Sequence, residues 1–175
     1  MKYLIIKIKL TVAILILSAN TYGGDSSATT ATCRSGEKAY FSCKTRNSKL
    51  ISLCASEGNN KISSLTYYFG DITNPELIQT SSSETNFDPF RFNHYFRYGV
   101  DYSRVSFSRG GYRYEIYIDY DLEKTPAESY GISVASLATP DREIKIECYK
   151  EAQANLSPLF TILKCDKKNS LGCGK

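Results

Sequence analysis

Hydrophobic and polar residues alternate along two adjoining runs in the middle of the chain, between Tyr102 and Asp121. One face of these runs collects the apolar and aromatic side chains of Val105, Phe107, Tyr112, Tyr114, Ile116 and Ile118, together with Ser103. A repeat of two residues is typical of strands with one buried face. Gly110 and Gly111 separate the runs and allow the positive φ that a tight turn needs. The pattern therefore predicts a β-hairpin with its apolar face in the core.

The register of this hairpin has two alternatives. A loop made of Arg109 and Gly110 sets Arg104 against Glu115, which is an opposite-charge pair on the polar face. A loop made of Gly110 and Gly111 shifts the pairing by two residues. Because side chains alternate with a period of two, both registers keep the same residues on the buried face. In both, the charged side chain of Glu115 is expected to be exposed.

Further short runs with strand character follow one another along the chain, separated by turn-forming residues. They cover residues 39–43, 49–54, 62–69, 75–80, 89–100, 130–134 and 143–149. The last run places Ile144, Ile146 and Cys148 on one face, which we expect to be a core face. About seven or eight short strands with almost no helix predict an all-β fold, an antiparallel β-sandwich or barrel stabilised by disulfides.

The C-terminal tail differs from the rest. Residues 156–164 predict a short helix, with Ser157 as the N-cap and Pro158 at the first helical position. We therefore expect a short helical or irregular tail after the last strand.

The first 23 residues have the organisation of a secretory signal peptide, with lysines, an apolar segment and then small polar residues. The apolar segment is too short and too interrupted by lysine for a membrane anchor. The mature chain is expected to begin between about residue 19 and residue 25. Residues 24–32 are predicted to be a flexible polar leader and residues 33–175 a single β domain. The protein is thus expected to be periplasmic or secreted, without a membrane anchor after cleavage.

Removal of the leader changes the charge of the protein. The whole chain has 22 basic and 18 acidic residues, a net charge of +4. The leader holds three lysines and no acidic residue, so the mature chain has a net charge of +1. A nearly neutral protein has no electrostatic basis for binding nucleic acid or an anionic membrane.

Six cysteines lie in the expected mature chain: Cys33, Cys43, Cys54, Cys148, Cys165 and Cys173. An even number in an exported protein is typical of disulfides, here three. Cys165 and Cys173 are close in sequence and are expected to pair, and Cys148 is expected to pair with Cys43 or Cys54. The spacings contain no C-x-x-C motif and no nearby histidine, so we predict no zinc and no other cofactor.

Few residues are candidates for catalysis or metal binding. His94 is the single histidine, so a Ser-His-Asp hydrolase would have to use it. It lies in an aromatic run, where packing among rings is the favoured interpretation, and we predict that the protein is not an enzyme. Asp119, Asp121 and Glu123 alternate at a strand end, which suits either an extracellular calcium site or a solvated strand end.

The hairpin tip is the best candidate for binding a partner. It consists of Ser108, Arg109, Gly110, Gly111 and Tyr112. Arginine and tyrosine are over-represented at binding hot spots. Tyr112 has an alternative role in packing within the hairpin. A second candidate surface is the aromatic segment 90–98, as a stacking platform for a cell-surface sugar or peptide.

The signal peptide, the disulfide-bearing β domain and a glycine-containing tip that ends in Tyr112 are similar to the bacterial periplasmic lysozyme inhibitors. In several branches of that family a Ser-Gly-x-Tyr loop enters the lysozyme cleft and occupies its catalytic carboxylates. Here Gly110, Gly111 and Tyr112 match, while Arg109 stands in place of the serine, with Ser108 just before it. The resemblance implies a lysozyme, or another extracellular protein, as the partner.

Such a partner suits the chemistry of the tip. The catalytic site of a lysozyme holds two carboxylates, which a guanidinium and a hydroxyl can bind. The chain also resembles a group of exported bacterial proteins without an assigned function, in the sequence segments 53–56, 66–70 and 107–112.

Overall fold

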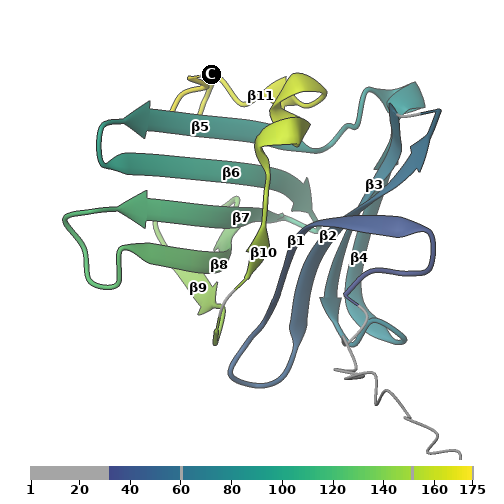
Figure 1. The fold of residues 1–175 in the computed structure, drawn as a ribbon, viewed down its shortest axis with the longest axis horizontal. Coiled ribbons are helices and arrows are strands. Elements are labelled where there is room, and N and C mark those ends of the chain that lie inside the picture. Colours follow the sequence, from purple (N-terminus) through teal and green to yellow (C-terminus); the bar gives the residue numbers. More distant parts are fainter. Residues whose placement is uncertain (1–31, 60, 151, 175) are drawn as a thin grey trace, which may run out of the picture. The chain divides into compact units, whose positions relative to one another are not determined.

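The structure is a computed structural model that describes residues 32–59, 61–150 and 152–174. The expected signal peptide and nearly all of the polar leader lie outside these residues. The described residues fall in one compact unit, Ala31–Lys175. They form two β-sheets packed as a sandwich, so the prediction of an all-β sandwich is confirmed (Figure 1).

The first sheet has the strand order β10-β1-β2-β3-β4 and is antiparallel throughout. Its strands are β1 (Glu37–Lys44), β2 (Leu50–Gly58), β3 (Lys61–Gly70), β4 (Pro75–Ser82) and β10 (Gln153–Ala154). The edge strand β4 begins at Pro75, as expected, because proline lacks the N–H that an inner strand must donate.

The second sheet has the order β11-β5-β6-β7-β8-β9, with β11 parallel to β5 and all other pairs antiparallel. Its strands are β5 (Arg91–Arg97), β6 (Val100–Arg109), β7 (Tyr112–Asp121), β8 (Glu128–Ser136), β9 (Glu143–Glu147) and β11 (Lys164–Cys165). The described residues therefore form eleven strands rather than seven or eight, and the two strands of two residues, β10 and β11, lie in the tail.

Two short 3₁₀ helices complete the fold, η1 (Ser83–Thr85) and η2 (Ser157–Thr161). The expected tail helix is thus present as η2, but its N-cap is Leu156 and no side chain caps it. The prediction of Ser157 as N-cap was wrong by one residue. Pro158 does occupy the start of the helix, where its fixed φ is favourable.

The central hairpin, β6 and β7, pairs Arg109 with Tyr112, so Gly110 and Gly111 form the loop. Their φ angles are +59° and +80°. The loop of Arg109 and Gly110 was therefore the wrong alternative, because only a Gly-Gly loop gives positive φ at both positions without strain. The prediction of the faces is confirmed for Val105 and Ile116, which oppose each other and are both fully buried.

The core lies between the sheets and is rich in aromatic rings. Tyr67 of β3 and Phe107 of β6 meet with ring centroids 5.0 Å apart. Leu159 of η2 is fully buried against the same cluster. By contrast, Ile144 of β9 is 67% exposed, although the alternation of β9 predicted a core position for it. The strand β9 is the last of its sheet, and the core does not extend under this residue.

The outer face of the second sheet carries a network of ion pairs. Arg104 lies 3.3 Å from Glu115 and 2.6 Å from Asp119, while Arg113 lies 2.8 Å from both Glu115 and Asp166. The Glu115 side chain is only 17% exposed, so the prediction that it is exposed was wrong. Burial would lower the pKa of Arg113, but the hydrogen bond and charge of Glu115 and those of Asp166 raise it overall. The tail residue Asp166 therefore helps to cover this face.

Three disulfides join the described cysteines: Cys33–Cys54, Cys43–Cys148 and Cys165–Cys173. The local pair was predicted, and Cys148 bonds one of its two expected partners. The bond from Cys43 links β1 of the first sheet to the residue that follows β9 of the second. It therefore ties the first sheet to the edge strand of the second.

Candidate functional site

The hairpin tip is exposed, but its arginine is engaged. Ser108, Arg109, both glycines and Tyr112 are all exposed residues. The Arg109 guanidinium donates a hydrogen bond through Nη1 to the backbone carbonyl of Ile78 in β4. The tip is therefore tied to the edge strand of the other sheet. Ser108 and Tyr112 remain exposed side chains for a partner, whereas Arg109 has an internal role that sequence reasoning missed.

Two further apolar side chains lie near the tip. Leu137 follows β8, and its backbone N–H donates to the Gly111 carbonyl at 2.9 Å. Ile144 pairs with Val134 of β8, which lies two residues from Ser136, the residue that pairs with Tyr112. Leu137, Ile144 and Tyr112 are all exposed, and we call them the tip patch. Ile144 was missed because its alternation pattern predicted burial.

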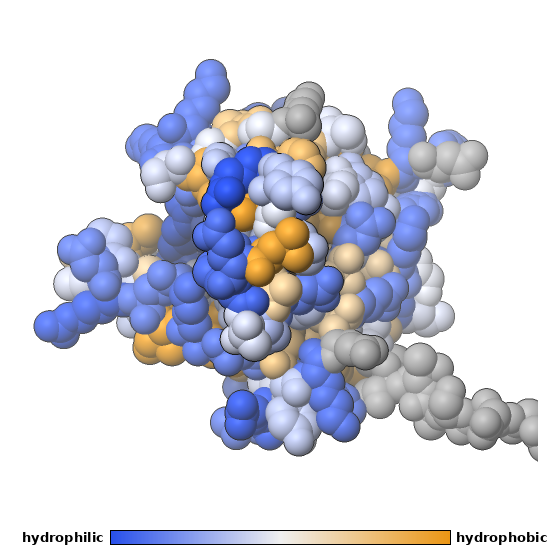
Figure 2. Space-filling view, turned by 60° about the vertical axis from the view of Figure 1, so that its left-hand side comes forward, coloured by the Kyte–Doolittle hydropathy of each residue, from blue (hydrophilic) through white to orange (hydrophobic). Residues whose placement is uncertain are grey.

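The opposite end of the central hairpin exposes more aromatic surface. Phe96 is 68% exposed and Tyr98, in the turn between β5 and β6, is 93% exposed. Tyr95 and Leu122 are also exposed, and the Leu122 N–H donates to Gly99 at 2.9 Å, which joins the two neighbouring turns. Figure 2 turns this end toward the viewer and shows apolar surface in the foreground beside hydrophilic side chains. We call these four residues the aromatic end.

A groove of about 410 Å³ lies beside the aromatic end, between the core-side face of the second sheet and the segment that leads into η2. In Figure 1 the chain from β10 to η2 crosses in front of β6 and β7. Six residues define its chemistry: Phe96, Asp101, Tyr120, Glu128, Tyr130 and Asn155. The apolar side chains of Ile118 and Leu156 also line the groove. Its volume falls within the range of small-molecule sites.

Four of the groove residues form one row across four strands. Phe96 of β5 opposes Asp101 of β6, Asp101 opposes Tyr120 of β7, and Tyr120 opposes Glu128 of β8. Side chains in register on neighbouring strands point to the same face of a sheet. Aromatic rings and carboxylates therefore alternate along this row. Phe96 belongs to the aromatic segment that was predicted as a stacking platform, whereas the other three members were not predicted as site residues from the sequence.

His94 lies next to the groove and has two hydrogen-bond partners. Its Nε2 is 3.1 Å from Asp101 Oδ1, and its Nδ1 is 2.7 Å from the Gly174 carbonyl. Its ring packs against Phe160 at 5.2 Å. The Ser103 hydroxyl donates to Asp101 and not to the imidazole. A Ser-His-Asp mechanism needs the histidine between the other two, so this arrangement does not have triad geometry.

The carboxylates considered for calcium are bound by protein groups. Asp121 accepts hydrogen bonds from the Tyr102 hydroxyl at 2.6 Å and from the Glu123 backbone N–H at 3.1 Å. The hydrogen bond from Tyr102, followed by that from Glu123, lowers the pKa of Asp121. Asp119 is paired with Arg104. Both carboxylates thus already have protein partners, and Asp121 is buried, so a solvated strand end does not describe Asp121.

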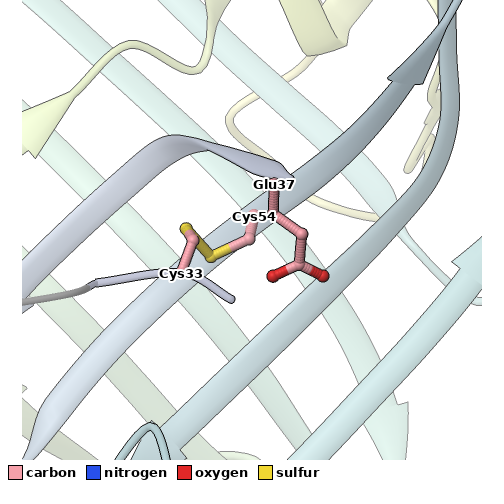
Figure 3. A group of neighbouring side chains, drawn as sticks. All are labelled: Cys33, Glu37 and Cys54. Atoms are coloured by element: carbon pink, nitrogen blue, oxygen red, sulfur yellow. A yellow bond between two sulfur atoms is a disulfide. The ribbon is translucent and has the colours of Figure 1, made fainter. Parts of the chain in front are cut away.

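One group of three potential metal ligands occurs among the described residues, namely Cys33, Glu37 and Cys54 (Figure 3). The two sulfur atoms are joined in a disulfide, so neither is a thiolate. Glu37 accepts a hydrogen bond from the Tyr68 hydroxyl at 3.0 Å. Zinc sites use thiolate sulfur, so the oxidised protein does not offer one here.

The fold and these surfaces define a disulfide-bonded β-sandwich domain with two exposed apolar regions, one beside a groove. No protein-family model, curated protein or solved structure matches the chain. The three disulfides are consistent with an exported protein in an oxidising compartment. Within the part of the chain that the structure describes, no helix is long and apolar enough to cross a membrane.

Proposed function

We propose that this protein is an exported binding module and that its groove binds a carbohydrate. The observation that carries this proposal is the row in which Phe96, Asp101, Tyr120 and Glu128 alternate across four strands. A sugar ring has apolar C–H faces and a rim of hydroxyl groups. Aromatic rings pack against the faces, and carboxylates accept hydrogen bonds from the rim.

The surroundings of the row support an extended ligand. Tyr130 and Asn155 add a ring and an amide to the groove. Phe96 and Tyr98 extend the aromatic surface past the end of the groove, and both are largely exposed in the free protein. A contiguous exposed apolar patch on a protein surface commonly marks an interaction site. An oligosaccharide that lies across the strands can contact both regions.

Replacement Phe96→Ala is expected to weaken sugar binding by a factor of about 30, because truncation of a binding aromatic costs about 2 kcal/mol. Isothermal titration with a panel of oligosaccharides measures this effect. The fold should survive because Phe96 is largely exposed. The matched control is Tyr112→Ala, which removes an exposed ring from the tip patch at the other end of β7. Equal affinities of the wild type and Phe96→Ala for every bound sugar would contradict the proposal.

A second candidate is lysozyme inhibition through the hairpin tip. The tip patch favours it, because Tyr112, Leu137 and Ile144 present apolar surface next to Ser108 and Arg109. Interfaces have an apolar centre and a polar rim. The near-neutral charge of the mature chain gives little electrostatic steering toward a basic lysozyme.

If this second candidate is correct, Tyr112→Ala should weaken inhibition of a lysozyme by about ten-fold or more in a cell-wall lysis assay. Chicken-, goose- and invertebrate-type lysozymes should each be tested. Arg109→Ala is a less specific probe, because it also removes the bond to Ile78. Arg97→Ala is the control, since it removes an exposed arginine far from the tip along the sheet. Absence of inhibition for all three types would reject the candidate.

A further inference from the structure

We infer that the groove selects a cationic carbohydrate, an oligomer of amino sugars with free amines. The inference rests on the proposed function and specifies the ligand of the same groove. It follows from two features: the sign of the charges that line the groove, and their spacing along the row.

The charged residues that line the groove are all acidic. They are Asp101, Asp119 and Glu128, and none of the lining residues is lysine or arginine. The side chain of Asp119 lies on the outer face, because Asp119 alternates with Tyr120 along β7, and it pairs there with Arg104 at 2.6 Å. Asp101 and Glu128 are left, and their contacts come from His94, Ser103 and Tyr130. An ammonium group forms an ion pair and a charge-assisted hydrogen bond with a carboxylate, whereas an acetylated amine keeps one N–H donor but has no positive charge.

The spacing of the two carboxylates suits a ligand with repeated charges. Asp101 lies on β6 and Glu128 on β8, with Tyr120 of β7 between them. Two strand spacings correspond to roughly 10 Å. Phe96 lies on the other side of Asp101 in the same row. An ammonium group beside an aromatic face is further stabilised by the cation–π interaction. A chain of amino sugars presents ring faces and ammonium groups in turn, which matches this row.

The row presents side chains of interior strands. The strands β6, β7 and β8 are interior strands of the second sheet, and they supply Asp101, Tyr120 and Glu128 through their side chains. Rings and carboxylates in turn suit the faces and the amines of an amino sugar. Ala154 of β10, the edge strand of the first sheet, also lines the groove. A basic peptide that adds a strand to this edge is therefore the alternative occupant that the experiment has to distinguish.

Titration calorimetry with the mature protein tests the inference. The probes are glucosamine tetramer and N-acetylglucosamine tetramer, at mildly acidic pH where the free amines are protonated. We expect the glucosamine tetramer to bind about ten-fold more tightly or better, and this preference to shrink at high salt, because salt screens exposed charges. Glu128→Gln should weaken glucosamine binding by about ten-fold. Asp101→Asn is a second variant with the same expected direction.

Glu123→Gln is the matched control, since it removes an exposed carboxylate that does not line the groove. Equal or tighter binding of the acetylated tetramer, or an equal effect of Glu123→Gln and Glu128→Gln, would overturn the inference while the groove remains a sugar site. Absence of binding to any oligosaccharide would instead remove the proposed function itself. Binding of an oligolysine peptide that depends on Glu128, without binding of either tetramer, would replace the sugar with a basic peptide.

Discussion

Joint replacement of Cys43 and Cys148 by serine is expected to lower the free energy of unfolding by about 5 kcal/mol in the chain-entropy description of disulfides. The two cysteines are 105 residues apart in sequence. Their bond restricts most of the domain in its unfolded state. In the folded state it joins β1 to the end of β9, next to the bridge between Thr45 and Cys148. A loss of this size is comparable to the whole stability of many domains.

The matched control is the pair Cys165 and Cys173, which closes a separation of only 8 residues. The same description assigns this bond about 2.5 kcal/mol, because the entropy of a closed loop grows with the logarithm of its length. Urea titrations of both double variants give the comparison. A loss for the short loop that equals or exceeds the loss for the long loop would show that the entropy of the unfolded chain is not the main effect.

The local features of the fold could be predicted because they follow from local chemistry. Period-two alternation identified the buried face of the central hairpin, and Val105 and Ile116 confirm it. The even cysteine count predicted disulfides, and short separation predicted the bond between Cys165 and Cys173. In each case a few neighbouring residues carry enough information. The assembly of the sheets was not needed for these predictions.

Exposure on the outer face and at the edge could not be predicted in this way. The burial of Glu115 depends on Arg113 and on the tail residue Asp166, which is 51 positions away from Glu115 in sequence. Ile144 has the alternation of a core residue, yet the core does not reach it. A pattern along one strand shows which side chains share a face. It does not show whether another part of the chain covers that face.

The residues of the groove could be predicted from the sequence only in part. The Gly110-Gly111 loop sets Asp101 opposite Tyr120, and the turn at Tyr98 and Gly99 sets Phe96 opposite Asp101. Three members of the row thus follow from two tight turns, once the right register of the central hairpin is chosen. The fourth member, Glu128, depends on the longer connection between β7 and β8. The segment from β10 to η2, which closes the groove, is set by packing far along the chain.

Replacement Ile116→Asp is expected to lower the free energy of unfolding by about 4 kcal/mol or more, which would unfold a domain of modest stability. Ile116 is fully buried between Val105 of β6 and Ile132 of β8, which are fully buried as well. An aspartate there loses the apolar contacts and places a carboxylate where no cation or donor side chain faces it in the row. Burial of an unpaired charge is among the few changes that produce losses of this size.

Ile144→Asp is the matched control, since it makes the same chemical change on the same face of the same sheet. Ile144 is 67% exposed, so its new carboxylate stays in water and the expected loss is about 0.5 kcal/mol or less. Glu115→Ala should fall between the two, at about 1–3 kcal/mol, because it leaves Arg104 and Arg113 without a shared partner on a largely covered face. Denaturant titrations rank the three variants. Equal losses for Ile116→Asp and Ile144→Asp would mean that the buried face has been assigned to the wrong residues, because burial is the difference from which the larger loss is expected.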